Sequence, residues 1–160
     1  MEEIIQTAAQ QDSAQQNKTP LQIHIENREK EWLIKISKLN EQLKTLEGIR
    51  DLQTVIVTER QIAVDYYYKV LRMLSTLNKE YRPKYADMYD YFKTKTDIRL
   101  NSDQAITAHV QGKLASSIMD IELMNNHAKY MQETIKSIDD IIYAIQNRLQ
   151  LEKLIKGYDV

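Results

Sequence analysis

The chain has 160 residues, which is enough for one domain with a modest core. Hydrophobic residues make up 42% of it and exclude a generically disordered chain, while only 3 Gly and 2 Pro argue against a turn-rich all-β fold. The absence of Cys excludes disulfides, thiol catalysis and thiolate metal sites, and the net charge of −1 indicates no particular partner. Scarce Gly and Pro with abundant helix-forming residues predict an all-α fold, and the absence of Cys favours a cytoplasmic location. No apolar run reaches the ~18 residues that span a bilayer, so we expect no membrane partner.

The first part of the chain predicts an N-terminal arm followed by a long helical region. Residues 1–20 are rich in Gln, Ala, Thr and Asn, end at a Pro and predict a mobile arm. Residues 21–158 form a single predicted helical domain, which begins with a first long helical region over 21–82. Apolar residues there recur at heptad spacing, and the register slips beside Gly48, where a backbone distortion costs least. One long helix and a helix interrupted near Gly48 both stay open. The apolar positions are Trp32, Ile36, Leu39, Leu43 and Leu46, then Ile49, Leu52, Ile56, Ala63, Tyr66, Val70, Met73 and Leu77.

The middle of the chain predicts a break between two long helices. Arg82 precedes Pro83, and a residue before Pro is pushed out of the α region, so we expect the first helix to end there. Residues 83–101 then form a Tyr/Lys-rich connecting segment. A second helix is predicted over 102–157, with an N-cap in the run Asn101-Ser102-Asp103 and a left-handed C-terminal cap at Gly157.

The second helix carries the most regular apolar pattern in the sequence. Alternating steps of four and three predict a seam for packing against another helix. One interpretation is an antiparallel hairpin with the first helix; another adds contacts between subunits of a homo-oligomer, because isoleucine at both seam positions favours assemblies larger than dimers. We assign the seam to oligomerisation. Its residues are Met124, Ala128, Met131, Ile135, Ile138, Ile142, Ile145 and Leu149.

No group of residues predicts catalysis, a metal site or a cofactor. His24, His109 and His127 have no partner at metal-ligand spacing, and the three Gly are isolated, so no phosphate-binding loop is indicated. No Ser stands in a nucleophile elbow, and neighbouring Asp139 and Asp140 point about 100° apart on a helix. We therefore expect a binding or assembly protein and not an enzyme.

One window has an unusual composition. Between residues 66 and 99 lie eight of the twelve aromatic residues, with eight cationic and four acidic side chains, a net charge of +4. Cations that replace counterions and aromatic faces that stack on bases are typical of single-stranded nucleic-acid binding. The alternative is that the Tyr residues pack the end of the helical core while Lys and Arg solvate the surface. Composition leaves both interpretations open.

The order of three motifs resembles the UvsY-type recombination mediators of tailed phages. Val64-Asp65-Tyr66-Tyr67 is similar to a hydrophobic-Asp-Tyr-Tyr motif, and the run 100–106 is similar to the entry into the last helix of that family. The third likeness is a C-terminal set that ends near Gly157. It comprises Tyr130, Ile135, Ile138, Ile145, Arg148 and Glu152. The family carries Lys and Arg shortly before Asp-Tyr-Tyr, where this chain has Gln61 and Ala63.

The resemblance implies a homo-oligomeric ring that binds single-stranded DNA, single-strand-binding protein and a RecA-like recombinase in the host-cell cytoplasm. Such a mediator loads the recombinase in place of the single-strand-binding protein. Tyr66 and Tyr67 are both candidates for contact with the strand; if Tyr66 is core, as its seam phase suggests, Tyr67 is the one expected to stack on bases. The alternative function is a non-enzymatic coiled-coil structural or adaptor protein, such as a virion component. The residues expected to contact DNA are Arg60, Tyr67, Lys69, Arg72, Lys84, Lys93, Lys95 and Arg99.

Overall fold

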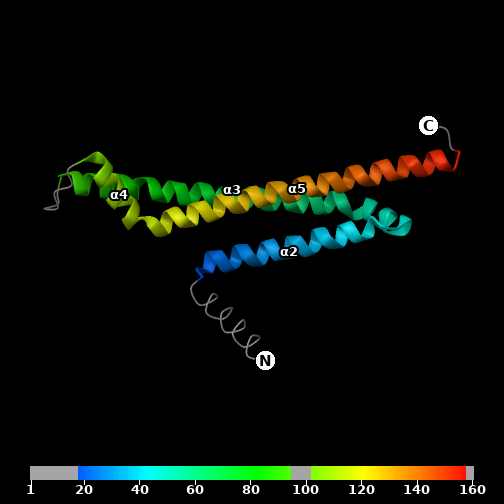
Figure 1. Cartoon of the computed structure of the whole chain (residues 1–160), viewed down its shortest axis with the longest axis horizontal. Helices are drawn as coiled ribbons and strands as arrows, with labels where there is room; N and C mark the ends of the chain where they lie inside the picture. Colours follow the sequence, from blue (N-terminus) through cyan, green and yellow to red (C-terminus); the bar gives the residue numbers. More distant parts are fainter. Residues whose placement is uncertain (1–17, 95–101, 158–160) are drawn as a thin grey trace, which may run out of the picture.

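The computed structural model describes residues 18–94 and 102–157, and in them it confirms the all-α prediction. Figure 1 shows α3 and α5 running antiparallel along a rod, with α2 beside them over one half and α4 near the opposite end. Residues 1–17 of the predicted arm lie outside the described part. No helix in the described ranges is long and apolar enough to cross a membrane. The helices are α2 (Pro20–Gln42), α3 (Leu46–Thr94), α4 (Asp103–Lys113) and α5 (Ala115–Ile155).

The start of α2 is fixed by a reciprocal capping box. The Thr19 hydroxyl accepts a hydrogen bond from the Gln22 backbone N–H at 3.2 Å, and the Gln22 side chain accepts one from the Thr19 N–H at 2.8 Å. Pro20 occupies the first helical position, where its missing N–H costs nothing. The helical domain thus begins at Pro20, one residue before the predicted limit.

A tight turn at residues 43–45 divides the predicted first helical region over 21–82 into α2 and α3, so of the two possibilities left open near Gly48 the structure has the interruption. The Thr45 hydroxyl caps α3 by accepting the Gly48 N–H at 3.0 Å. A Cβ at Gly48 would clash with the Gln42 carbonyl oxygen, so this close approach requires glycine. Arg148 of α5 donates to the Leu43 carbonyl at 2.6 Å and ties the turn to the rod. The register slip beside Gly48 therefore marks a reversal of the chain.

Pro83 lies inside α3, so the prediction that Arg82-Pro83 ends the helix is wrong, and most of the predicted connector 83–101 is helical up to Thr94. Pro83 is exposed, and the Lys79 carbonyl that loses its helical partner can bind water instead. The helix continues because its next turns pack on α4, with large side chains that contribute up to about 1.5–3 kcal/mol each when fully buried. This packing outweighs the roughly 3 kcal/mol that an interior Pro costs.

Replacing Pro83 with alanine should stabilise the protein. The change restores a helical hydrogen bond and removes the ring clash, so we expect the free energy of unfolding to rise by about 1–2 kcal/mol, after a small loss from the freer unfolded chain. Urea unfolding followed by circular dichroism measures it, with Thr76→Ala on the same exposed face of α3 as a control. A lower unfolding midpoint for Pro83→Ala would show that the proline favours the native helix.

The predicted second helix over 102–157 is also divided, because Leu114 departs from helical geometry with φ −101° and ψ 14°. Leu114 is buried, and the bend brings α4 onto the end of α3. Both predicted caps are confirmed. The Ser102 hydroxyl accepts the Ala105 N–H at 3.1 Å, and Gly157 has φ +69°.

The main core lies where α5 packs between α2 and α3. Every residue of the predicted C-terminal seam is buried or half-buried there, so the seam is used within one chain. Ile141 and Thr134 are buried more deeply than their seam neighbours Ile142 and Ile135. Because α5 contacts two helices, its buried stripe is wider than the seam of a two-helix pair. The fully buried side chains of this core include Ile49, Leu52 and Ala63 from α3 and Met131 and Ile138 from α5.

Candidate nucleic-acid interface

A groove of about 480 Å³ opens between the start of α2, the middle of α3 and the first half of α5. Its floor is apolar and includes the buried Ile25, Val70 and Met124. Its rim carries exposed basic groups from two helices. We call this site the basic groove; it is lined by His24, Ile25, Arg28, Tyr66, Lys69, Val70, Arg72, Met73, Met124 and His127.

The charge of the basic groove comes mainly from α3. Lys69 and Arg72 are exposed, and neither has an ion-pair partner within the described part of the chain. Arg28 of α2 is partly neutralised, since it donates to Glu31 at 2.8 Å, and its guanidinium lies 5.7 Å from the centre of the Tyr66 ring. Among the described residues that line the groove there are Lys and Arg side chains and no carboxylate, a composition suited to a phosphate.

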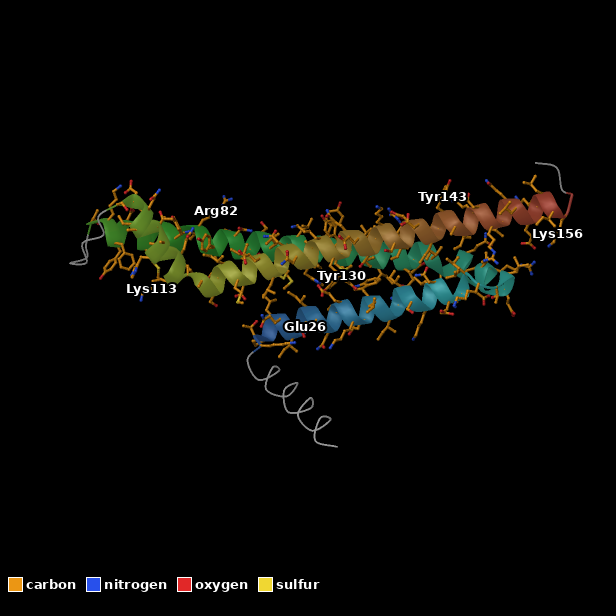
Figure 2. The ribbon with its side chains drawn as sticks, in the orientation of Figure 1. Glu26, Arg82, Lys113, Tyr130, Tyr143 and Lys156 are labelled. Atoms are coloured by element: carbon orange, nitrogen blue, oxygen red, sulfur yellow. The ribbon has the colours of Figure 1, made fainter. Side chains whose placement is uncertain are left out.

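A buried polar network forms the inner wall of the basic groove and joins all three helices. The imidazole of His127, 1% exposed, places Nδ1 2.9 Å from Glu29 Oε1 and Nε2 3.1 Å from the Tyr66 hydroxyl. A carboxylate only accepts, so Nδ1 donates to Glu29, and Nε2 of the neutral ring accepts from Tyr66. Tyr130 stacks on His127 and donates to the Glu29 carbonyl at 2.8 Å; Figure 2 shows it where α5 faces α2.

The Tyr66 side chain is therefore part core and part groove wall. Burial raises the pKa of its hydroxyl above the usual value, an effect that nearby Arg28 opposes. The hydroxyl consequently stays protonated at physiological pH and acts as a hydrogen-bond donor.

Beyond the groove, basic residues continue along the exposed face of α3. Arg72 and Lys79 lie two turns apart on the same face of α3, Lys84 follows Lys79 by five residues, and a shallow depression runs past Lys79 and Lys84. We call Lys69, Arg72, Lys79 and Lys84 the basic stripe, which spans about 22 Å of helix. Glu80 and Asp87 line the same depression and weaken the potential at its outer end.

Arg60 does not join the predicted partners Lys69 and Arg72. Nine residues at about 100° each put Lys69 half a turn away from Arg60 on α3. Arg60 instead makes a two-point contact with Asp139 of α5, at 2.5 Å from Nε and 3.3 Å from Nη2, and this carboxylate raises the pKa of Arg60. The pairing places Arg60 outside the basic groove and corrects its assignment.

Tyr67 does not take the position expected of a base-stacking residue, whereas Tyr66 packs on the core as its seam phase suggests and also lines the groove. Tyr67 is half-buried against two core clusters, and its hydroxyl accepts a hydrogen bond from Gln132 at 2.6 Å. It lies on the flank of α3 that carries Arg60, while Tyr66 lines the groove. Tyr68 is the exposed member of the run, 55% accessible. Tyr67 is therefore a packing residue in this structure and does not offer a free face to a base.

Much of the remaining aromatic window packs α3 against α4, as the alternative interpretation of its composition expected. The side chains involved are half-buried on the core formed by Ile106, Val110 and Leu114. Neighbouring rings lie 5.9 Å apart for Tyr81 and Tyr85 and 6.2 Å apart for Tyr85 and Tyr89. The packed residues are Tyr81, Tyr85, Met88, Tyr89 and Phe92.

The remaining predicted cations do not strengthen the groove. Lys93, at the end of α3, lies 5.5 Å from the Tyr89 ring centre and 4.0 Å from an Asp103 carboxylate oxygen. It belongs to the contact with α4. Lys95 and Arg99 lie outside the described residues, and their assignment stays a prediction.

The α2 side of the groove was missed by sequence reasoning. His24 and Arg28 are four residues apart and so share a helix face, which is a weak signal in itself. Only the turn at 43–45 folds that face back beside Lys69 and Arg72. In the described residues no three His, Asp or Glu side chains gather in a way that could hold a metal ion. No family model, curated protein or solved structure matches the chain.

Proposed function

We propose that this protein binds single-stranded DNA without sequence preference through the basic groove and performs no chemistry. The observation that carries the proposal is the meeting of His24 and Arg28 from α2 with Lys69 and Arg72 from α3 over an apolar floor. Lys and Arg replace counterions on phosphates, and the floor together with Tyr66 offers apolar contact to bases. The basic stripe extends the path of the strand along α3.

We further propose that the protein acts as a recombination mediator. The support is its resemblance to UvsY-type proteins together with a binding surface of modest charge. Such a surface gains strength when several copies bind one flexible strand, because each further contact is intramolecular. The proposed partners are a RecA-like recombinase and a single-strand-binding protein. The protein should accelerate assembly of the recombinase on a strand already covered by single-strand-binding protein.

Assembly of several copies is part of this proposal. The end of α5 exposes Leu151, Leu154 and Ile155, at 58%, 63% and 85%, just beyond the core residue Leu149. Leu151 and Ile155 also line an apolar depression with Leu46. Side chains this exposed contribute little to the core of one chain, and we take them as the surface through which copies assemble.

Light scattering should report a mass several times that of the 18.9 kDa chain. Leu151→Asp/Ile155→Asp should reduce this mass without loss of helicity, because both side chains are exposed. Leu33→Asp, an equally exposed apolar position on α2, is the matched control and should leave the assembly intact. A wild-type protein that is monomeric at micromolar concentration would contradict the proposed homo-oligomeric ring.

The competing function is a structural or adaptor coiled-coil protein. It is favoured by the packing of Tyr81, Tyr85 and Tyr89 against α4, which removes these rings from strand binding. Fluorescence anisotropy with a labelled thymidine oligonucleotide separates the two functions. We expect binding at about 0.05 M salt that weakens strongly toward about 0.2 M. Absence of binding at the lower salt would favour the structural role.

A further inference from the structure

We propose that the basic groove holds one phosphate group with the Tyr66 hydroxyl as a donor, and that His127 takes up a proton when the phosphate binds. The phosphate site is inferred from the geometry of the groove. That the phosphate belongs to a DNA strand rests on the proposed function. It concerns a buried histidine that strand binding alone does not require.

The hydrogen-bond directions in the network supply the first step. With a neutral His127, the Tyr66 proton points at Nε2 and is unavailable to a ligand. A protonated imidazole has two N–H donors, so Nδ1 still donates to Glu29 while Nε2 donates to the Tyr66 oxygen. The Tyr66 hydroxyl must then turn its own proton elsewhere. Tyr66 lines the groove, where a phosphate oxygen can accept that proton.

The surrounding charges supply the second step. A proton on His127 lies behind the cations of the groove and 2.9 Å from the Glu29 carboxylate. A bound phosphate adds negative charge beside the ring, so it favours the protonated form relative to the empty groove. By linkage the affinity for phosphate must then rise as the pH falls. The groups that face the network are Arg28, Glu29 and Glu31 from α2, Tyr66, Lys69 and Arg72 from α3, and Tyr130 from α5.

Histidine is the side chain that normally changes charge between about pH 5 and pH 8, and the groove contains a second one, the exposed His24. The measurement is therefore made in a His24→Gln background. A thymidine oligonucleotide is the probe, because its phosphodiesters keep their charge over this range. Anisotropy gives its affinity at several pH values for His24→Gln alone and for His24→Gln/Tyr66→Phe.

We expect the single variant to bind more tightly as the pH falls, by up to about tenfold per pH unit for one linked proton. The double variant should bind much more weakly than the single variant near pH 5.5 and almost equally near pH 8, where the hydroxyl of Tyr66 points at His127 in any case. A loss of affinity that is the same at every pH would give Tyr66 a structural role only and overturn the inference. Circular dichroism serves as the control that both variants are folded.

A second pair of measurements separates this inference from the proposed function. His127→Gln removes the titrating ring and should flatten the profile; an unchanged profile would overturn the inference. Inorganic tripolyphosphate replaces the oligonucleotide in a parallel titration, and comparing variants at one pH cancels the ionisation of the probe. Binding of tripolyphosphate alone, with the pH-dependent Tyr66→Phe effect, would support the phosphate site and reject DNA as its ligand. Binding of neither probe would overturn both.

Discussion

Replacing Ile138 with aspartate should unfold most of the chain at room temperature. Ile138 is fully buried where α5 meets α2 and α3, in a cluster that includes Trp32 and Leu52. The change removes about 1.5–3 kcal/mol of apolar burial and adds several kcal/mol for an unpaired buried charge. Together these approach the roughly 5–15 kcal/mol by which a domain of this size is stable. Circular dichroism should show a large loss of helical signal.

Ile142→Asp is the matched control. Ile142 is half-buried on the same helix, so the carboxylate of an aspartate at this position can reach water. It should unfold at a lower urea concentration than the wild type but remain helical without urea. A folded, monomeric Ile138→Asp protein would show that this part of α5 serves contacts between chains and not the core of one chain.

Removing both free cations of the basic groove should weaken single-strand binding on the order of 50-fold at about 0.05 M salt. Each phosphate contact on a single strand contributes about 0.7 to the slope of log affinity against log salt, so Lys69→Ala/Arg72→Ala should flatten the slope by about 1.4 per protomer. Both side chains are exposed, so the fold should be unaffected. A salt titration by fluorescence anisotropy measures slope and affinity together.

The control for this prediction changes the same charge elsewhere. Lys129 and Lys136 are exposed on the face of α5 away from the core, and their double alanine variant should keep nearly the wild-type slope. Arg60→Ala should also keep it, because Arg60 is engaged with Asp139. Equal losses in all three variants would indicate general attraction by net charge and no defined groove.

The sequence predicted elements better than their arrangement. Ser102 and Gly157 act as the expected caps because a cap is a local interaction within a few residues. The register slip beside Gly48 indicated a possible interruption but not a reversal of the chain, because Gly48 stands three residues beyond the turn and matters through contact with Gln42. Helical continuation through Pro83 was missed for a similar reason, since it depends on packing against α4 from the other end of the chain.

The candidate site shows the same limit. Exposure of Lys69 and Arg72 was predictable from their position relative to Val70 on one helix. Their position in one groove with Arg28 depends on which face of α2 meets α3, and the separation of Arg60 depends on its contact with α5. The phase of the first seam placed Tyr66 in the core, but its ring lies at the edge of that core, where it also lines the groove.

The measurement that tests the basic groove most directly is photocrosslinking of a thymidine oligonucleotide to the full chain, with adducts located by mass spectrometry. We predict adducts in two peptides distant in sequence, one from residues 20–31 of α2 and one from residues 66–74 of α3, and their joint loss in Lys69→Ala/Arg72→Ala. Adducts confined to the other flank, beside Arg60 and Gln132, or to residues 95–101, would contradict the groove as the path of the strand.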